Sequence, residues 1–480
     1  MTDVRSDDFT LINKADDVLP LYRGNGQAEN RQYIGFETEI GVYKKGADGK
    51  PAGASTKETA DLLQYIKDLG HQPQLEMASA VEYASPPFRV TEVRRLVDEI
   101  NNAWDAYNGA IKAKGFTPNN SSFFPFATLE TAEGNLVDRD RARGLVKGMK
   151  LHKNPEFLKV TLLATSTQVS LSYKDADDLY DLLATGYALQ APIFGLFATY
   201  PAYVEGQEKP VDYNPRAAFY SAFGQQGGIP DSFLQAKDGE DFIRRHAQQV
   251  LETPLLYYYD QDKNIVWPEK PVTLNELKDI GLNTKSNYDL AESFIYTDLK
   301  IANIRDEEGK PTGKRIEVRG IDAGELGVKA GVPFIHAALR DPETREQVKA
   351  LLADYGLTPG QDGWQERLKQ ARHNAAFHGG KYLDVAFGVR PDGAEGNLKE
   401  FSRELGNILQ LHAQRNPDVK DALQPLIDIT RSGLTIAEQK ARATKSYEHA
   451  NSQLLAVAND DTPRSAHTAR FTQSARTGGP

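Results

Sequence analysis

Residues 32–43 read QYIGFETEIGVY and predict a β-strand with two different faces. Side chains two positions apart project to the same side of a strand, so Glu37 and Glu39 stand together while Phe36 and Ile40 point the other way. Two carboxylates about 4 Å apart repel by roughly 4 kcal/mol at an effective dielectric constant of about 20, unless a proton, a basic group or a cation lies between them. The simpler explanation is a solvated edge strand with a polar outer face. The alternative is a site in which a proton, a basic group or a cation lies between the two carboxylates, and the rest of the chain has to decide.

The combination of a glutamate with apolar neighbours recurs at three other positions. Glu76 and Glu82 lie in QLEMASAVEYASPP, and Glu317 lies in RIEVRG. Glutamate is seldom placed inside apolar strands without a compensating partner. Gln168, at the centre of STQVSLS, adds an amide oxygen. Carboxylate and amide oxygens without any thiolate suit hard cations such as Mg²⁺ or Mn²⁺, although the residues alone do not show that these groups meet in one site.

The rest of the sequence predicts an α+β fold with a largely antiparallel sheet flanked by helices. Strands and helices are mixed without a regular βαβ alternation, and neither a G-x-G-x-x-G sequence nor a P-loop occurs. Besides 32–43, the expected strands are 157–173, 314–324, a half-buried strand at 257–260 and two short extended pieces before Pro86. The expected helices are 56–69, a helix from a Thr91 cap to about 114, one that follows the strand 157–173, and a mostly helical region from 333 to about 450. Residues 200–235 are expected to form an ordered long loop.

The composition along the chain divides it into three parts. Residues 1–30 are polar and are expected to be a loosely held lead-in. Residues 31–455 are expected to form a single domain with a helical C-terminal part. Residues 456–480 contain little that can pack, so they are expected to be disordered.

Charge and composition exclude several classes of protein. The chain has 480 residues and a formal net charge of −10, which gives no electrostatic support for a nucleic-acid partner. It has no cysteine, which excludes disulfides, thiolate metal sites and a cysteine nucleophile. The first residues do not resemble a secretory signal, and no segment approaches the ~18–20 unbroken apolar residues of a membrane helix. We therefore expect a cytoplasmic protein without a membrane partner; the sequence is silent on its oligomeric state.

Five segments occur in an order that resembles a known family. They are GFETEIG, LEMASAVEYASPP, TSTQVSLSY, PVDYNPRAAFY and KRIEVRGID. This order is similar to that of the glutamate–cysteine ligases of the plant and proteobacterial type, over roughly residues 30–450. The resemblance implies the curved, funnel-shaped antiparallel sheet of the glutamine synthetase-like catalytic fold.

The resemblance also implies roles for the individual residues. The ligands of the inner cations, near the amino-acid substrate, would be Glu39, Glu76 and Glu82. The ligands of the cation that bridges the nucleotide phosphates would be Glu37, Gln168 and Glu317. The expected catalytic residues are Arg319, which would reach the transferring phosphoryl group or the acid substrate, and Arg216, which would clamp a carboxylate or phosphate. The expected ATP-binding residues are Gln168, Ser170, Arg216 and Arg319. For each arginine, an ion pair with a neighbouring glutamate remains the alternative.

The chemistry implied by the resemblance is ATP-dependent amide formation. The γ-carboxylate of glutamate would attack the γ-phosphate of ATP, and an amine, most simply cysteine as in glutathione biosynthesis, would capture the acyl phosphate. Two to three Mg²⁺ or Mn²⁺ ions would neutralise the phosphates. The alternatives are a ligase for another amino acid or amine, a non-catalytic relative that binds a nucleotide or an amino acid, and a phosphotransferase of the same fold.

Three departures from the family pattern fall on segments expected to face the substrate. An Asp-Trp pair followed by a His is missing from NYDLAESFIYTDLK, Gln226 stands near a position that usually holds arginine, and Ser170 and Ser172 replace the polar residues of QVNLDY. The expected metal ligands are intact, so we expect unchanged phosphoryl chemistry with an acid or amine partner that the sequence does not identify. The histidines expected to be structural are His336, His373 and His378.

Overall fold

The computed structural model describes residues 9–24, 31–46, 51–76, 80–119, 121–124, 127–137, 139–151, 158, 161–199, 203–204, 207–208, 214–222, 226–305 and 311–439. The chain divides into two units, Met1–Ala437 and Glu438–Pro480. Every element discussed below lies in the first unit; in the second, residues 438–439 are helical. The tail 456–480 lies outside the described residues, so its disorder stays a prediction.

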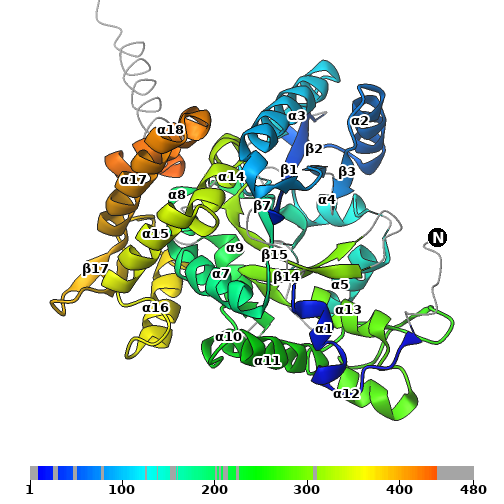
Figure 1. Ribbon diagram of the computed structural model, residues 1–480. Helices are drawn as coiled ribbons and strands as arrows, with labels where there is room; N and C mark the ends of the chain where they lie inside the picture. The colour runs from blue at the N-terminus through cyan, green and yellow to red at the C-terminus, as the bar shows by residue number, and fades with distance from the viewer. Residues whose placement is uncertain are drawn as a thin grey trace, which may run out of the picture. The chain divides into compact units, whose positions relative to one another are not determined.

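The described part of the chain contains a nine-stranded antiparallel sheet, and this sheet carries the site discussed below (Figure 1). Its strands are β1 Tyr33–Lys45, β2 Pro51–Gly53, β3 Gln74–Glu76, β4 Ala80–Ala84, β5 Phe88–Arg89, β6 Thr117–Asn119, β7 Ser166–Ser172, β14 Leu299–Arg305 and β15 Pro311–Asp322. The order across the sheet is β14, β15, β7, β1, β4 and β3, and β2, β5 and β6 also pair with β1. The strands expected at 32–43 and 314–324 and the two extended pieces before Pro86 are confirmed.

The alternation of β1 separates an apolar face from a polar one. Phe36 and Ile40 are buried on the apolar face, and Thr38 between them shares a 3.1 Å hydrogen bond with Thr167 of β7. Gly41 lies on the opposite face, where a Cβ atom would stand 2.5 Å from the Phe124 ring. The lack of a side chain at Gly41 therefore lets this ring close one end of the polar face.

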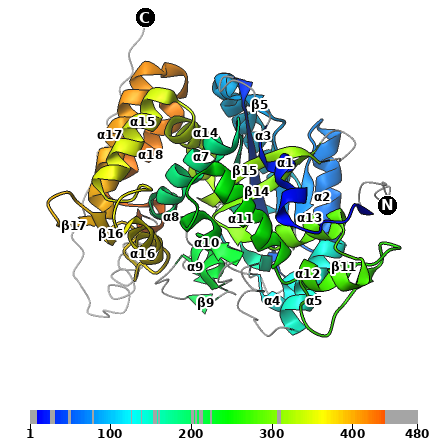
Figure 2. The ribbon, with the colours of Figure 1, turned by 60° about the horizontal axis from the view of Figure 1, so that its bottom comes forward.

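Helices cover the apolar face of the sheet (Figures 1 and 2). They are α3 Val93–Ala113, α7 Ala176–Ala188, α8 Gln190–Leu196 and α14 Glu325–Leu339. The contact between α7 and β14 is close at Gly186, because a Cβ atom there would overlap the Leu299 side chain. The apolar residues of the strands thus form one continuous core with these helices. The polar face of the sheet, which carries Glu37 and Glu39, does not take part in this core.

The remaining described helices are α1 Leu19–Tyr22, α2 Thr56–Asp68, α4 Leu129–Gly134, α5 Asp140–Leu151, α9 Pro215–Ala222, α10 Asp231–Leu234, α11 Gly239–Leu251, α12 Leu274–Leu277, α13 Lys285–Ser293, α15 Pro342–Asp354, α16 Trp364–Ala376, α17 Leu398–Arg415 and α18 Lys420–Ser432. The short strands are β8 Tyr203–Val204, β9 Gln207–Glu208, β10 Gly227–Gly228, β11 Tyr258–Tyr259, β12 Ile265–Val266, β13 Tyr296–Thr297, β16 Ala386–Val389 and β17 Glu395–Asn397. Helices α15, α17 and α18 gather at one side in both views, which confirms the expected helical region over its described residues (Figures 1 and 2). The half-buried strand expected at 257–260 is confirmed as β11.

Two predicted elements differ from the structure because tertiary packing changes the local outcome. The strand predicted at 157–173 begins only at Ser166, and residues 161–163 are helical. Leu158 and Leu162 are both buried, and a spacing of four places two side chains on one face of a helix as well as of a strand, so the local pattern does not separate the two. The long loop predicted over 200–235 contains helices α9 and α10.

Thr91 does not cap the helix that follows it. It lies inside a 3₁₀ turn, Val90–Glu92, and the first position before α3 makes no side-chain capping bond. The turn is held instead by the N–H of Val90, which donates to the carbonyl of Gln32 at 2.9 Å. This tertiary contact decides where the helix begins.

The N-terminal segment expected to be loosely held includes a part that packs into the core. Val18, Leu19 and Tyr22 are buried. The Tyr22 hydroxyl donates to Glu292 Oε1 at 2.6 Å, and Glu292 also forms a buried ion pair with Lys314 of β15. Helix α1 is thereby attached to the strand that carries Glu317. Among the described residues, no helix combines the length and apolarity needed to cross a membrane.

Candidate active site

The register of three strands brings three of the predicted carboxylates together. Glu39 of β1 lies directly opposite Glu82 of β4. Glu76 of β3 lies opposite Ala80, the residue two before Glu82, and so shares their face of the sheet. One carboxylate oxygen from each of Glu39, Glu76 and Glu82 lies within 4.8 Å of the others. We call these three residues the inner cluster.

A second group continues along the same face. Glu37 pairs with Gln168 of β7, and Ser170 of β7 pairs with Glu317 of β15. Two arginines on β15, Arg315 and Arg319, are spaced by two from Glu317, on either side of it, and contact it. We call Glu37 and Glu317 the outer pair. All six predicted metal ligands therefore lie on one face of adjacent strands; their role as ligands stays a prediction.

Burial and like charges raise the pKa values of the carboxyl groups on this face. Burial and, next, the neighbouring Glu76 raise the pKa of Glu82 to about 9 and that of Glu39 to about 7. Burial and Glu317 raise the pKa of Glu37 to about 7, although Arg315 and Arg319 oppose this. Burial and crowding thus both disfavour the ionised form of these carboxyl groups.

The inner cluster has the donor set that a hard divalent cation requires. Three carboxylates converge within 4.8 Å, and burial together with this crowding raises the pKa values of Glu39 and Glu82. Oxygen ligands of this kind suit Mg²⁺ and Mn²⁺. A divalent cation would relieve the repulsion among the three carboxylates without an additional basic side chain. The residues therefore fit the predicted metal.

The raised pKa values predict how stability depends on pH in the absence of a metal. Below about pH 4.5 the carboxyl of Glu82 is protonated in both the folded and the unfolded state, whereas between about pH 4.5 and 9 only the unfolded state releases the proton. The free energy of unfolding should therefore fall as the pH rises from about 5 to 9 in a chelator. Mg²⁺ or Mn²⁺ should oppose this fall because a cation binds the ionised carboxylates. Melting temperatures measured with and without the metal, for the wild type and Glu82→Gln, test this; a metal-independent profile would contradict it.

Arg319 joins the outer pair to the cavity described below. Its Nε lies 3.2 Å from Glu317 Oε1, its guanidinium carbon lies 5.7 Å from the centre of the Tyr220 ring, and its backbone N–H donates to the carbonyl of Asp298. Burial opposes its charge, but Tyr220 and Glu317 raise the pKa of Arg319 above its ordinary value. Arg319 is therefore a half-buried, permanent cation on the wall of the cavity.

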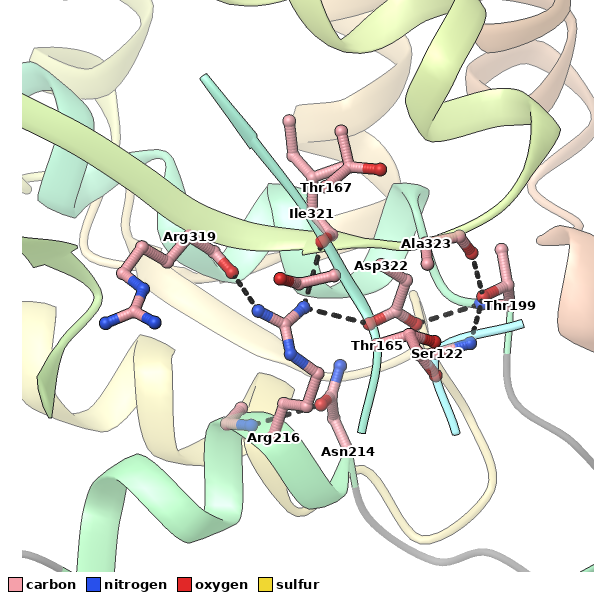
Figure 3. A network of polar contacts seen from close by, with 12 residues as sticks. Ser122, Thr165, Thr167, Thr199, Asn214, Arg216, Arg319, Ile321, Asp322 and Ala323 are labelled. Carbon is pink, nitrogen blue, oxygen red and sulfur yellow. Dashed lines mark hydrogen bonds and ion pairs between the residues drawn. The ribbon is translucent and has the colours of Figure 1, made fainter. Parts of the chain in front are cut away.

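Arg216 of α9 is held by a different network, shown in Figure 3. Its Nη1 donates to the carbonyl of Ile321 at 2.9 Å and lies 3.6 Å from Asp322 Oδ1, and its Nη2 donates to the carbonyl of Arg319. The ion pair expected as the alternative for Arg216 is thus present, with an aspartate instead of a glutamate. The network fixes the backbone on both sides of the β-bulge that follows Val318.

A cavity of about 180 Å³ opens beside the inner cluster. Its charged lining consists of Glu39, Glu76, Arg139, Arg216 and Arg319. Its apolar and aromatic lining includes Phe124, Val137, Leu145, Phe219, Tyr220 and Tyr296. The cavity therefore combines carboxylates for cations, guanidinium groups for anions and an apolar wall, which is the chemistry that an amino-acid substrate requires.

Two arginines of this site were not predicted from the sequence. Arg315 donates from Nε to Ser170 Oγ at 3.0 Å and contacts both members of the outer pair, and alternation along β15 would have placed it on the face of Glu317. Arg139, just before α5, lies with Nη1 3.6 Å from Glu76 Oε2, and no sequence signal pointed to it.

Gln226 does not line this cavity. It lines a separate polar groove with residues of α10 and α11, although we expected it on a substrate-facing segment. Its side chain donates to the carbonyl of Phe294 at 3.3 Å. The predicted structural histidines His336, His373 and His378 are also not among the residues that line the cavity.

The sequence matches the family model of glutamate–cysteine ligase family 2 (GCS2) over residues 33–456. The chain belongs to the GCS2 family. The match covers all the strands that carry the inner cluster and the outer pair. It confirms the resemblance recognised from the five ordered segments.

One solved structure supports the same conclusion about the fold. The glutamate–cysteine ligase of Francisella tularensis, solved in complex with AMP, is 13% identical with a TM-score of 0.50, and the alignment covers 86% of this chain and 85% of that one. More distant matches are the Pup ligase PafA, solved with the ubiquitin-like protein Pup, at 11% identity and TM-score 0.38 (88% and 70% covered), and Plasmodium falciparum glutamine synthetase at 11% and 0.33 (90% and 75%). No curated protein matches the chain.

Membership of the GCS2 family establishes the class of activity. The protein is an ATP-dependent ligase that forms an amide bond between a carboxylate and an amine. The predicted α+β fold with a curved, largely antiparallel sheet is likewise confirmed.

Proposed function

We propose that this GCS2 protein joins the γ-carboxylate of glutamate to the amino group of a second amino acid, with cysteine the leading candidate. The observation that carries the proposal is the meeting, at one cavity, of the carboxylate face and three arginines. A dicarboxylic amino acid brings carboxylates and a nucleoside triphosphate brings phosphates. Guanidinium groups can bind both kinds of anion with two parallel hydrogen bonds. We place the reaction in the cytoplasm, where ATP and free amino acids are both present.

The proposed reaction has two steps. An oxygen of the γ-carboxylate attacks the γ-phosphorus of ATP, which releases ADP and leaves an acyl phosphate. The nitrogen of the amine then attacks the acyl carbon, which releases phosphate and transfers a proton to a base. Glu39 and Glu76 of the inner cluster line the cavity, and a carboxylate there can accept that proton.

The residues of the chain have distinct roles in this proposal. Arg319, at the junction of the outer pair and the cavity, stabilises the phosphoryl group during its transfer. Arg216 fixes the backbone that carries Arg319 and presents charge to the acid substrate. The inner cluster would hold the cations next to the amino acid, and the outer pair with Gln168 would hold the cation next to the nucleotide. Two to three bound Mg²⁺ or Mn²⁺ ions would supply charge neutralisation of the phosphates.

The proposal predicts strict dependence of ADP release on both organic substrates. Purified protein with Mg²⁺, ATP and glutamate should release ADP and phosphate in equal amounts only after the correct amine is added. A panel of amino acids and small amines, with mass spectrometry of the product, identifies the amine. The apolar wall of the cavity leads us to expect stimulation by cysteine and similarly small apolar amino acids rather than by charged ones.

Three outcomes would contradict the proposal in different ways. If no amine stimulates ADP release with any acidic amino acid, the proposed substrates are wrong. Tight binding of Mg·ATP without turnover across both panels would indicate a non-catalytic relative. A stable phosphorylated product without an amide would indicate a phosphotransferase.

A further inference from the structure

Arg315 occupies the space between the two carboxylates of the outer pair. Its Nη2 lies 3.3 Å from Glu37 Oε1 and 3.4 Å from Glu317 Oε2. One guanidinium nitrogen therefore bridges the two residues to which the nucleotide-side cation is assigned above. Neither sequence analysis nor the roles proposed so far gives Arg315 a function.

The other nitrogens of Arg315 are fixed by neutral acceptors of the sheet. Nε donates to Ser170 Oγ at 3.0 Å, and Nη1 donates to the carbonyl of Asn303 at 3.0 Å. Ser170 belongs to the segment in which this chain departs from its family. Because these two bonds do not involve the carboxylates, the guanidinium stays in place when a ligand takes over the outer pair.

The two ends of the carboxylate face differ in how their charge is balanced. When both are ionised, Glu37 and Glu317 carry two negative charges, and they contact two arginines, Arg315 and Arg319. Among the described residues, the ion pair within 4 Å of the inner cluster is that of Arg139 with Glu76, whereas Glu39 and Glu82 make none within that distance. A free divalent cation is therefore attracted to the inner cluster and meets a neutralised outer pair.

We propose that Arg315 is the resident counter-charge of the outer pair, so that a cation enters this position only together with the nucleotide. The inference rests on the proposed function, which puts the nucleotide at this end of the face. Arg315 and Arg319 already neutralise the outer pair, so a cation at this position needs additional negative charge. The phosphates of the nucleotide supply that charge. When the cation takes Glu37 and Glu317, the two N–H groups of Arg315 Nη2 turn from carboxylate to phosphate oxygens, which are equally good acceptors.

The test counts bound Mn²⁺ without any turnover. Wild type, Arg315→Gln and Arg94→Gln are titrated with Mn²⁺ alone, and then with Mn²⁺ and the β,γ-imido analogue of ATP. Arg94 is an exposed helical arginine paired with Asp98, so its variant controls for the loss of one positive charge. We expect Arg315→Gln to bind one Mn²⁺ more per chain than the other two in the absence of the analogue. With the analogue the wild type should gain this ion, and Arg315→Gln should bind the analogue about tenfold more weakly, as for one lost charge-assisted contact.

The result that would overturn the proposal is equal Mn²⁺ binding by wild type and Arg315→Gln without the analogue. Should Arg315→Gln fail to fold, as judged by its melting curve, Arg315→Lys decides the question. Lysine keeps the charge but not the fork, so it should show no additional ion and weaker binding of the analogue; an additional ion would refute the proposal. None of these measurements requires the acid or the amine, so they stay decisive if the proposed amide product is wrong.

Discussion

Replacing Glu39 with glutamine is expected to lower turnover by on the order of 100-fold or more, because the inner cluster loses one of the three carboxylates that we propose hold a cation. The fold should tolerate the change. Oε2 of Glu39 accepts the backbone N–H of Ser166 at 2.6 Å, and the glutamine carbonyl can accept the same bond. Because burial and Glu76 raise the pKa of Glu39 to about 7, removing its charge also relieves repulsion. The melting temperature of the metal-free variant should therefore equal or exceed that of the wild type.

A matched variant separates this effect from a general effect of charge. Glu99 of α3 is an exposed glutamate that accepts a hydrogen bond from Tyr83 on the apolar side of the sheet, so Glu99→Gln should leave turnover close to that of the wild type. Excess Mn²⁺ should restore part of the activity of Glu39→Gln. A lowered melting temperature with unchanged turnover would show that Glu39 is a structural acid and would remove it from the site.

Arg319→Lys is expected to reduce turnover by on the order of 100- to 1000-fold, although the positive charge is kept. A lysine ammonium cannot present two parallel N–H groups to a phosphoryl group, and this geometry is what a preorganised arginine contributes to phosphoryl transfer. Since Arg319 contacts Glu317 and the Tyr220 ring, a modest fall in melting temperature should accompany the loss. The loss should appear mainly in kcat, because the contact matters most in the transition state.

Arg390→Lys is the control for the structural part of this change. Arg390 also makes an ion pair, with Glu404 at 3.1 Å, and also lies over a tyrosine ring, that of Tyr355, at 5.3 Å, but it does not line the cavity. Because Arg390 and Glu404 are more exposed, its substitution by lysine should lower stability by no more than Arg319→Lys does, and it should leave kcat unchanged. If both variants lose the same activity, Arg319 acts only through stability.

Local sequence patterns predicted the strands that carry the site better than the segments around them. The alternation at Glu37 and Glu39 and the apolar surroundings of Glu317 follow from the period of a strand, so they were visible without any structure. The segment before Ser166 was mispredicted because leucines four apart also occur in β-rich sequence, and packing decided for a helix there. Thr91 and the N-terminal residues up to Tyr22 were mispredicted because the deciding contacts are distant in the sequence: Val90, next to Thr91, donates to Gln32, and Tyr22 donates to Glu292.

The amino-acid sequence by itself determined which residue types face one side of each strand, and the order of five segments determined the family. Strand pairing decided what those residues do to one another. Glu39 meets Glu82 because β1 and β4 are antiparallel in one particular register, and a shift by one residue would place the two carboxylates on opposite faces. The same holds for Arg315 of β15. It contacts Glu37 of β1 because a single strand, β7, lies between these two strands, and an arginine side chain is long enough to reach across it. Side-chain alternation is a local property of the backbone, whereas register depends on the packing of the whole sheet against its helices, and for that reason only the tertiary structure could assemble the site.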